Sequence, residues 1–230
     1  MLALWRLLSP GQPDWTALEI SELAPEGLQV LSALGARYLM LPAGIALPAT
    51  FEHRLRTVYT GTDATILENA GAAPRARVAS TVLATDGEAA TDQAIAEPTF
   101  DARTMAAVER AQPGTSPPPG AHGTVAVVRR EDARVTLRAR LDRRGLVVLD
   151  EALLPGWSVR VDGRPAPALR VDDVMRGVIV PAGQHRIVWS YAVPGLRVGA
   201  LVSLLTLVAL AGGALALGGR SRRSLPGAAR

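Results

Sequence analysis

Residues 198–217 form a stretch of 20 residues without a charged side chain, VGALVSLLTLVALAGGALAL. As a helix with a rise of about 1.5 Å per residue, this stretch matches a hydrocarbon core of roughly 30 Å. A buried helix of a globular domain would carry a polar stripe, whereas this stretch offers only Ser203 and Thr206. We therefore predict a transmembrane helix over residues 196–218, with the lipid bilayer as its partner.

The charges beside this stretch predict its orientation. Arg220, Arg222 and Arg223 follow it, and Arg197 alone precedes it. By the positive-inside rule, residues 219–230 form a basic cytoplasmic tail and residues 1–197 lie outside the cytoplasm.

The N-terminus does not look able to start that translocation. Its apolar run is interrupted by Arg6 and ended by Ser9 and Pro10, whereas a secretory signal needs about 7–15 apolar residues after a basic stretch. Two explanations stay open. The chain is the C-terminal part of a longer polytopic protein, which the arginine flank favours, or it is a tail-anchored protein.

The charge balance argues against nucleic acid as a partner. All 25 basic residues are arginine, and four of them lie in the last eleven residues with no acid among them. Residues 1–219 carry 21 arginines and 21 acidic residues, so the high isoelectric point reflects a short tail instead of a basic patch. The chain has no cysteine, which excludes disulfides, thiol nucleophiles and zinc sites with cysteine ligands.

Residues 1–110 predict a mixed α/β lobe. Asp14 can cap a short helix, and Pro25 begins a second one that Gly35 stops. Short runs bounded by Gly, Pro or Asp predict strands, and GEAATDQAIA predicts a helix. The expected strands are 37–41, 54–59, 65–68 and 77–83, and the last helix is 87–96.

A Pro/Gly-rich linker or long exposed loop is expected over residues 111–123. After it, apolar and polar side chains alternate over residues 134–141 and 157–161 in the period-two pattern of a half-buried sheet. The strongest turn signal is Asp162–Gly163, a pair suited to a tight hairpin. We predict an antiparallel β-sandwich-like domain over residues 124–195, with strands over 134–141, 145–149, 157–161, 175–180 and 185–191. A further strand returns from the hairpin, and Pro165 and Pro167 restrict it to a sheet edge.

No catalytic or metal site is predicted from these residues. His53, His122 and His185 lack the short spacings of zinc ligands. Phosphate-loop, dinucleotide-loop and serine-nucleophile motifs are missing, so no cofactor is expected. Asp172 and Asp173 suit a general acid and base, but their position between two strands favours a turn.

Three aromatic residues of the β domain allow two interpretations. Trp157, Trp189 and Tyr191 could form a platform that contacts a glycan, with Trp157 and Trp189 as the contacts. The alternation instead assigns both tryptophans to the interior, where they would fill the core of a small domain.

Four stretches of the chain are familiar, namely LGARYLML, VYTGTDATILENAGAAPRA, GLVVLDEALLPGWSVRVDGRPA and RGVIVPAGQHRIVWSYAVPGLRVGALVSLL. In content and in order they resemble the YfhO-like family of bacterial polytopic membrane proteins. The motif positions, for which we expect structural roles, are Glu68, Asn69, Pro74, Arg75, Pro155, Gly156, Trp157, Asp162, Gly163, Pro181, Gly183, His185 and Tyr191.

This resemblance implies a bacterial cell-membrane protein that transfers a sugar from a polyprenyl-phosphate donor to cell-envelope polymers. In such proteins the catalytic acid lies in a loop after the first membrane helix, a region with no counterpart in these 230 residues. The chain would then be a non-catalytic extracytoplasmic domain with the last membrane helix, near an envelope glycan or lipid-linked sugar. The alternative is a stand-alone, single-span adaptor or carbohydrate-binding β-domain.

Overall fold

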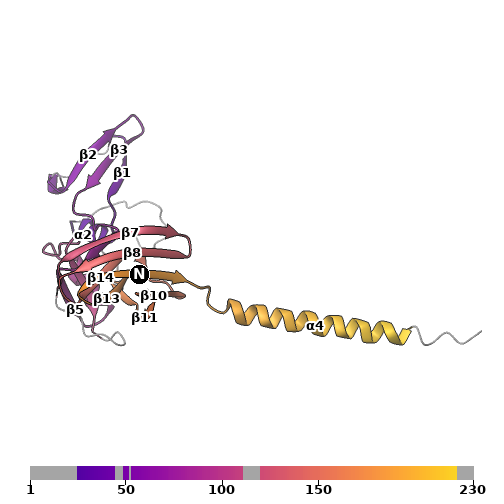
Figure 1. The fold of residues 1–230 in the computed structure, drawn as a ribbon. Helices are drawn as coiled ribbons and strands as arrows, with labels where there is room; N and C mark the ends of the chain where they lie inside the picture. Colours follow the sequence, from indigo (N-terminus) through magenta and orange to yellow (C-terminus); the bar gives the residue numbers. More distant parts are fainter. Residues whose placement is uncertain (1–24, 45–48, 52, 111–119, 222–230) are drawn as a thin grey trace, which may run out of the picture. The chain divides into compact units, whose positions relative to one another are not determined.

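The computed structural model describes residues 25–44, 49–51, 53–110 and 120–221, without the side chains of Arg197 and residues 213–221. The chain divides into two compact units, Met1–Tyr191 and Ala192–Arg230. Three sheets make up most of the first unit (Figure 1). The mainly β class expected from the sequence is therefore confirmed. The short helix predicted after Asp14 lies outside the described residues.

The first sheet has three strands in the order β1-β3-β2. The strands are β1 (Tyr38–Pro42), β2 (Leu55–Thr60) and β3 (Ala64–Asn69), and all pairs are antiparallel. One face of this sheet packs on helix α2 (Pro25–Ala33) and on the short helix η1 (Ala49–Phe51), through Leu28, Phe51, Leu55 and Leu67. Helix α2 ends as predicted, because Gly35 follows it with a positive φ of 69°.

The second sheet has six strands in the order β4-β9-β13-β12-β6-β5. Its strands are β4 (Ala76–Val78), β5 (Thr81–Thr85), β6 (Met105–Glu109), β9 (Gly145–Ala152), β12 (Leu169–Val171) and β13 (Met175–Val180). The single strand predicted over 77–83 is wrong. Its two halves are β4 and β5, at opposite edges of the sheet. The chain crosses over between them, because the amide of Ala79 donates to the carbonyl of Leu146 beside β4 and the amide of Ser80 donates to the carbonyl of Thr104 beside β5.

Strand β5 pairs with β6 in parallel, in contrast to the antiparallel pairs elsewhere in this sheet. Helix α3 (Glu88–Ala96) provides the crossover between them and matches the predicted helix. Its buried Ile95 packs in one hydrophobic cluster with Val30 of α2 and with Phe100.

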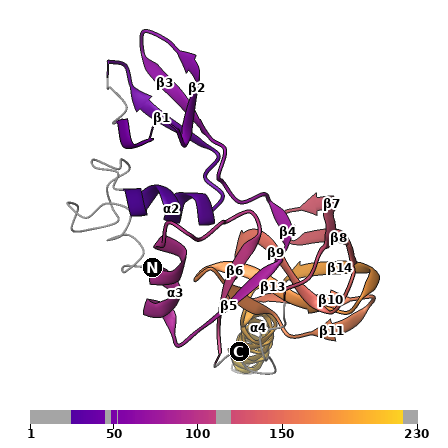
Figure 2. The same ribbon diagram turned by 90° about the vertical axis from the view of Figure 1, so that its left-hand side faces the viewer.

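The third sheet is antiparallel, with five strands in the order β11-β10-β14-β8-β7 (Figure 2). Its strands are β7 (Gly123–Glu131), β8 (Arg134–Leu141), β10 (Trp157–Val161), β11 (Arg164–Ala166) and β14 (Gly183–Tyr191). The predicted hairpin at Asp162–Gly163 is confirmed, and both residues have the positive φ that this turn requires. Strand β7 was not among the predicted strands.

The five-stranded and six-stranded sheets share one hydrophobic core. Leu137, Ile187 and Trp189 from the former pack with Val147 and Val178 from the latter, and all five side chains are buried. This packing of sheet on sheet is the sandwich arrangement expected for the C-terminal half.

The six-stranded sheet draws strands from both sides of the predicted linker. Strands β4, β5 and β6 precede it, and β9, β12 and β13 follow it, so the two predicted lobes share a sheet within one compact unit. The end of the expected linker is also ordered into this unit. Ala121 is buried, and its amide donates to the carbonyl of Ala79 at 3.0 Å.

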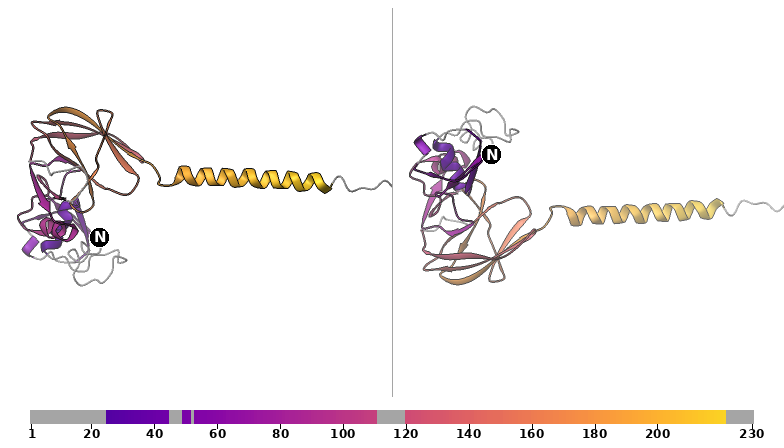
Figure 3. Two further views of the ribbon diagram at one scale, coloured as in Figure 1. Left: turned by 90° about the horizontal axis from the view of Figure 1, so that it is seen from below. Right: turned by 90° about the horizontal axis from the view of Figure 1, so that it is seen from above.

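The second unit contains helix α4 (Leu196–Ser221), drawn as one continuous helix in Figures 1 and 3. Its described large apolar side chains are exposed, among them Leu201, Leu204 and Leu207. Within the residues whose placement is described, no helix meets the combined length and apolarity needed to cross a bilayer.

Candidate functional site

Two motif residues meet at the end of the five-stranded sheet. Trp157 opens β10 directly opposite Tyr191, the last residue of β14. Their ring centroids are 5.3 Å apart and the ring planes are tilted by 50°. Pro155 and Gly156 form the turn before Trp157, and Gly156 has a φ of 104°, which a residue with a side chain adopts only under strain.

The two tryptophans differ in exposure although they share a face of the sheet. Trp189 is 0% exposed, as the core interpretation predicted. Trp157 is only partly buried, because it lies at the end of its strand and packs on the rim of the core. Of the two tryptophans proposed to contact a glycan, Trp157 alone is accessible.

Arg176, from β13 of the opposite sheet, stacks on Trp157. Its guanidinium carbon lies 3.5 Å from the Trp157 ring centroid and 5.8 Å from that of Trp189. The Nε donates to the carbonyl of Ala152 at 3.0 Å, and Nη2 lies 3.0 Å from Oε2 of Glu151. Burial lowers the pKa of Arg176, and Glu151 opposes this shift. Nη1 is buried and has no hydrogen-bond partner among the described residues.

Glu151 joins two further arginines to this group. Arg75 Nη1 lies 3.0 Å and Arg130 Nε 3.2 Å from the same oxygen, Oε1. Both arginine side chains are more than half exposed. We call this set the Glu151 cluster, and its members are Arg75, Arg130, Glu151, Trp157, Arg176 and Tyr191.

The Glu151 cluster brings together three of the motif positions, namely Arg75, Trp157 and Tyr191. Their convergence was not predicted from sequence, because Glu151 and Arg176, which connect them, lie in the family-like stretches but were given no role there. The available signal was Arg176, an arginine in an otherwise apolar predicted strand, since a buried guanidinium needs an acidic or aromatic partner.

A second group of motif residues connects the β10–β11 turn to strand β14. Asp162 Oδ2 lies 2.6 Å from His185 Nδ1, and Asp162 Oδ1 accepts from the amide of Arg186 at 2.8 Å. The carboxylate raises the pKa of His185, while the Arg186 amide and His185 lower that of Asp162. Pro181 and Gly183 flank the turn that presents His185. We call these two contacts of Asp162 the Asp162–His185 clip.

The remaining motif residues are Glu68 and Asn69, at the end of β3, and Pro74. Asn69 Nδ2 donates to Ser32 Oγ at 3.0 Å and to the Ala36 carbonyl at 3.1 Å. Glu68 forms ion pairs with Arg37 and Arg56, which lower its pKa. Pro74 is exposed in the segment before β4. Glu68 thus contributes contacts within the first sheet and Asn69 contacts between this sheet and the α2 region, whereas Pro74 directly precedes Arg75 of the Glu151 cluster.

The Asp172–Asp173 pair forms a turn, as predicted, and both residues have a positive φ. Sequence reasoning missed that Asp172 is fully buried and paired with Arg77 of β4. Oδ1 of Asp172 also accepts from the amide of Ala107 at 2.7 Å. These bonds occupy both carboxylate oxygens, so Asp172 serves the fold.

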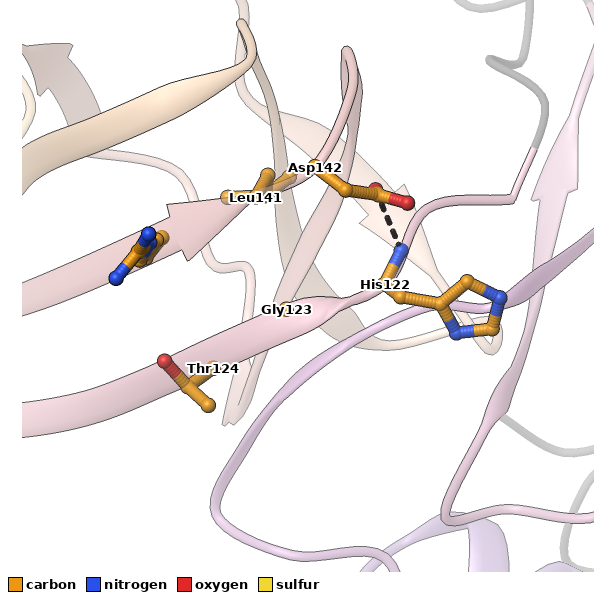
Figure 4. A pocket seen from close by; sticks show the side chains of 6 residues that line it. His122, Gly123, Thr124, Leu141 and Asp142 are labelled. Carbon is orange, nitrogen blue, oxygen red and sulfur yellow. Dashed lines mark hydrogen bonds between the residues drawn. The ribbon is translucent and has the colours of Figure 1, made fainter.

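A hollow of about 400 Å³ lies at the start of β7 and the end of β8 (Figure 4). Its lining includes His122, Thr124, Arg140 and Asp142, and the amide of His122 donates to Asp142. The hollow is open and contains none of the motif residues. Across the described ranges, no group of three or more histidine or acidic side chains could hold a metal ion.

A comparison with known protein families found a match over part of the chain. No curated protein and no solved structure matches the chain. Residues 125–203 match the family described as bacterial membrane protein YfhO. That range includes all of the Glu151 cluster except Arg75. Over residues 125–203, about a third of its length, the chain is therefore similar to the YfhO family of bacterial membrane proteins.

Proposed function

We propose that this chain is a non-catalytic, extracytoplasmic glycan-binding module of a YfhO-like membrane protein, attached to the membrane through α4. The parent protein would transfer a sugar from a lipid-linked donor to an envelope polymer, and this module would hold the saccharide. The observation that carries the proposal is the accessible Trp157–Tyr191 pair, fixed in place by Arg176.

The chemistry of this pair suits a saccharide. Apolar C–H faces of sugar rings pack on aromatic rings, and neighbouring polar groups orient the hydroxyls. One face of Trp157 is occupied by the guanidinium of Arg176, so a sugar would contact the remaining Trp157 surface and Tyr191. An aromatic platform of this kind works without a deep cavity.

Membrane attachment is supported by sequence and by the family. Residues 198–217 carry no charge, the described apolar side chains of α4 are exposed, and the YfhO family is one of membrane proteins. We propose that α4 crosses the bilayer with the arginine-rich tail in the cytoplasm.

Glycan binding is tested with the full chain in lipid nanodiscs on an array of bacterial envelope glycans. The expected result is binding that Trp157→Leu reduces at least tenfold. The matched control is Leu154→Ala, which alters an exposed apolar residue close to Trp157 in sequence. Equal binding by both variants contradicts the proposed site. Sugar transfer from a polyprenyl-phosphate donor by the purified chain would contradict the non-catalytic role.

Topology is tested by labelling, for which a chain without cysteine is well suited. A membrane-impermeant maleimide should label Val128→Cys in intact cells, and Ser224→Cys only after permeabilisation. The reverse pattern would place the β domain in the cytoplasm.

A further inference from the structure

Two exposed guanidinium groups are held side by side above one carboxylate oxygen. Arg75 lies just before β4 and Arg130 lies in β7, and both contact Oε1 of Glu151. Each uses one nitrogen for this contact, while a guanidinium has five N–H donors. The other donors of both groups remain within reach of a single phosphate or carboxylate.

The Glu151 cluster carries a net positive charge. Arg176 occupies the second oxygen of Glu151, so one carboxylate serves three guanidinium groups and two positive charges are left over. Asp150 is the nearest further acid in sequence, and counting it as ionised still leaves one. Like charges brought this close repel each other, which an anionic ligand would relieve.

Arg176 adds an independent observation. It is 4% exposed, and its Nη1 is a buried donor without a described partner. A buried guanidinium that is not fully bonded costs free energy. The same side chain stacks on Trp157, so the excess charge and the aromatic pair belong to one continuous site.

We propose that the Glu151 cluster binds a saccharide that carries an anionic group, a phosphate or a carboxylate. Arg75 and Arg130 hold the anion, and Trp157 and Tyr191 contact the sugar ring. This inference rests on the proposed function, and it adds the charge of the ligand. It also assigns the selection for a charged ligand to two arginines. Arg75 lies just before β4 of the six-stranded sheet, and Arg130 lies in β7 of the five-stranded sheet.

The test is calorimetric titration of the full chain in nanodiscs of phosphatidylcholine with three probes. The probes are glucose 1-phosphate, neutral glucose and inorganic phosphate. Glucose 1-phosphate should bind at least tenfold more tightly than either of the others, and its affinity should fall as salt increases. The double variant Arg75→Gln/Arg130→Gln should remove most of this advantage.

Arg129→Gln is the matched control, because Arg129 is exposed on the same strand as Arg130 and pairs with Glu131 instead. It should leave all three affinities unchanged. Thermal melting of each variant verifies that the fold is retained.

The outcomes separate this inference from the proposed function. Equal binding of glucose and glucose 1-phosphate, unaffected by the double variant, overturns the anionic ligand and leaves glycan binding intact. Equal binding of phosphate and glucose 1-phosphate shows that the aromatic pair adds nothing and overturns the combined site. Binding of none of the probes, together with a blank glycan array, overturns both.

Discussion

Arg77 and Asp172 form a buried ion pair between β4 and the turn that joins β12 to β13. Arg77 also donates from Nε and Nη2 to the carbonyl of Met105, at 3.3 and 3.2 Å. Arg77 therefore connects β4, at the edge of the six-stranded sheet, with β6 and with the β12–β13 turn, neither of which is adjacent to β4. The ion pair and these hydrogen bonds hold the three segments together inside the domain.

Loss of this pair should strongly destabilise the chain. Asp172→Asn keeps a side chain that tolerates the positive φ but leaves the Arg77 guanidinium buried without its counterion. We expect the free energy of unfolding to fall by about 3–5 kcal/mol, measured by chemical denaturation in detergent with tryptophan fluorescence. The control is Asp86→Asn, which removes an exposed pair with Arg110 and should cost less than about 1 kcal/mol. Similar losses of unfolding free energy for both variants would contradict this stabilising role of the Arg77–Asp172 pair.

Asp150 should make stability fall between acidic and neutral pH. Burial raises its pKa from 3.8 to about 6, so the folded chain holds this proton more tightly than the unfolded chain. The contribution to stability is complete below the unfolded pKa of 3.8 and is lost as the pH rises through 6. Asp150→Asn should therefore gain on the order of 2 kcal/mol relative to the unsubstituted chain at pH 7, and little at pH 4.

Denaturation curves from pH 4 to pH 7 check this. Asp142 provides an opposite control, because the His122 amide lowers its pKa. Asp142→Asn should lose stability at neutral pH, where Asp150→Asn gains it. Parallel pH profiles for the unsubstituted chain and Asp150→Asn would show that the carboxyl is ionised at no cost.

The Asp162–His185 clip should have its own pH window. His185 has a raised pKa, so its contribution is complete below 6.5 and is lost as the pH rises through the raised value. Asp162 has a lowered pKa, so its contribution is present above 3.8 and is lost on acidification. The coupling between the residues should peak between these limits, near pH 5–6.

A double-mutant cycle with His185→Gln and Asp162→Asn measures that coupling. Asparagine suits the positive φ of Asp162, so the turn is retained. A coupling energy that is unchanged between pH 5.5 and pH 9 would mean that the histidine charge plays no part in the clip.

The two tryptophans should respond differently to truncation. Trp189→Ala removes a fully buried ring and should cost about 3–5 kcal/mol of unfolding free energy. Trp157→Ala removes a partly exposed ring together with its stack on Arg176, and should cost less. Equilibrium denaturation of both variants gives the comparison. A larger loss for Trp157→Ala would mean that this ring is the true centre of the core.

The parts of the fold with strong local signals were predictable from sequence. Alternation identified β8 and β14, Asp162–Gly163 identified a hairpin, and Pro25 with Gly35 bounded α2. Strand β6 escaped because its sequence, MAAVE, is typical of a helix, and only its buried place between β12 and β5 makes it a strand.

The candidate site was predictable in its parts but not in its assembly. Trp157 and Tyr191 follow from the register of one hairpin-rich sheet. Arg176 reaches them from the opposite sheet, and Arg75 and Arg130 reach Glu151 from distant segments. Contacts of this kind depend on how sheets pack, which local sequence patterns do not encode.

The sharing of one sheet across the Pro/Gly-rich segment constrains how the chain can fold during synthesis. Strands β5 and β6 emerge from the ribosome early, yet the neighbour of β6 is β12, where Val171 lies opposite Val108. Until β12 has been synthesised, the nascent chain exposes the apolar edge of β6. The late pairing of these two distant strands slows folding. A fragment starting at the family-matched region would leave β9 and β12 without their outer neighbours, and we expect it to aggregate where the longer chain does not.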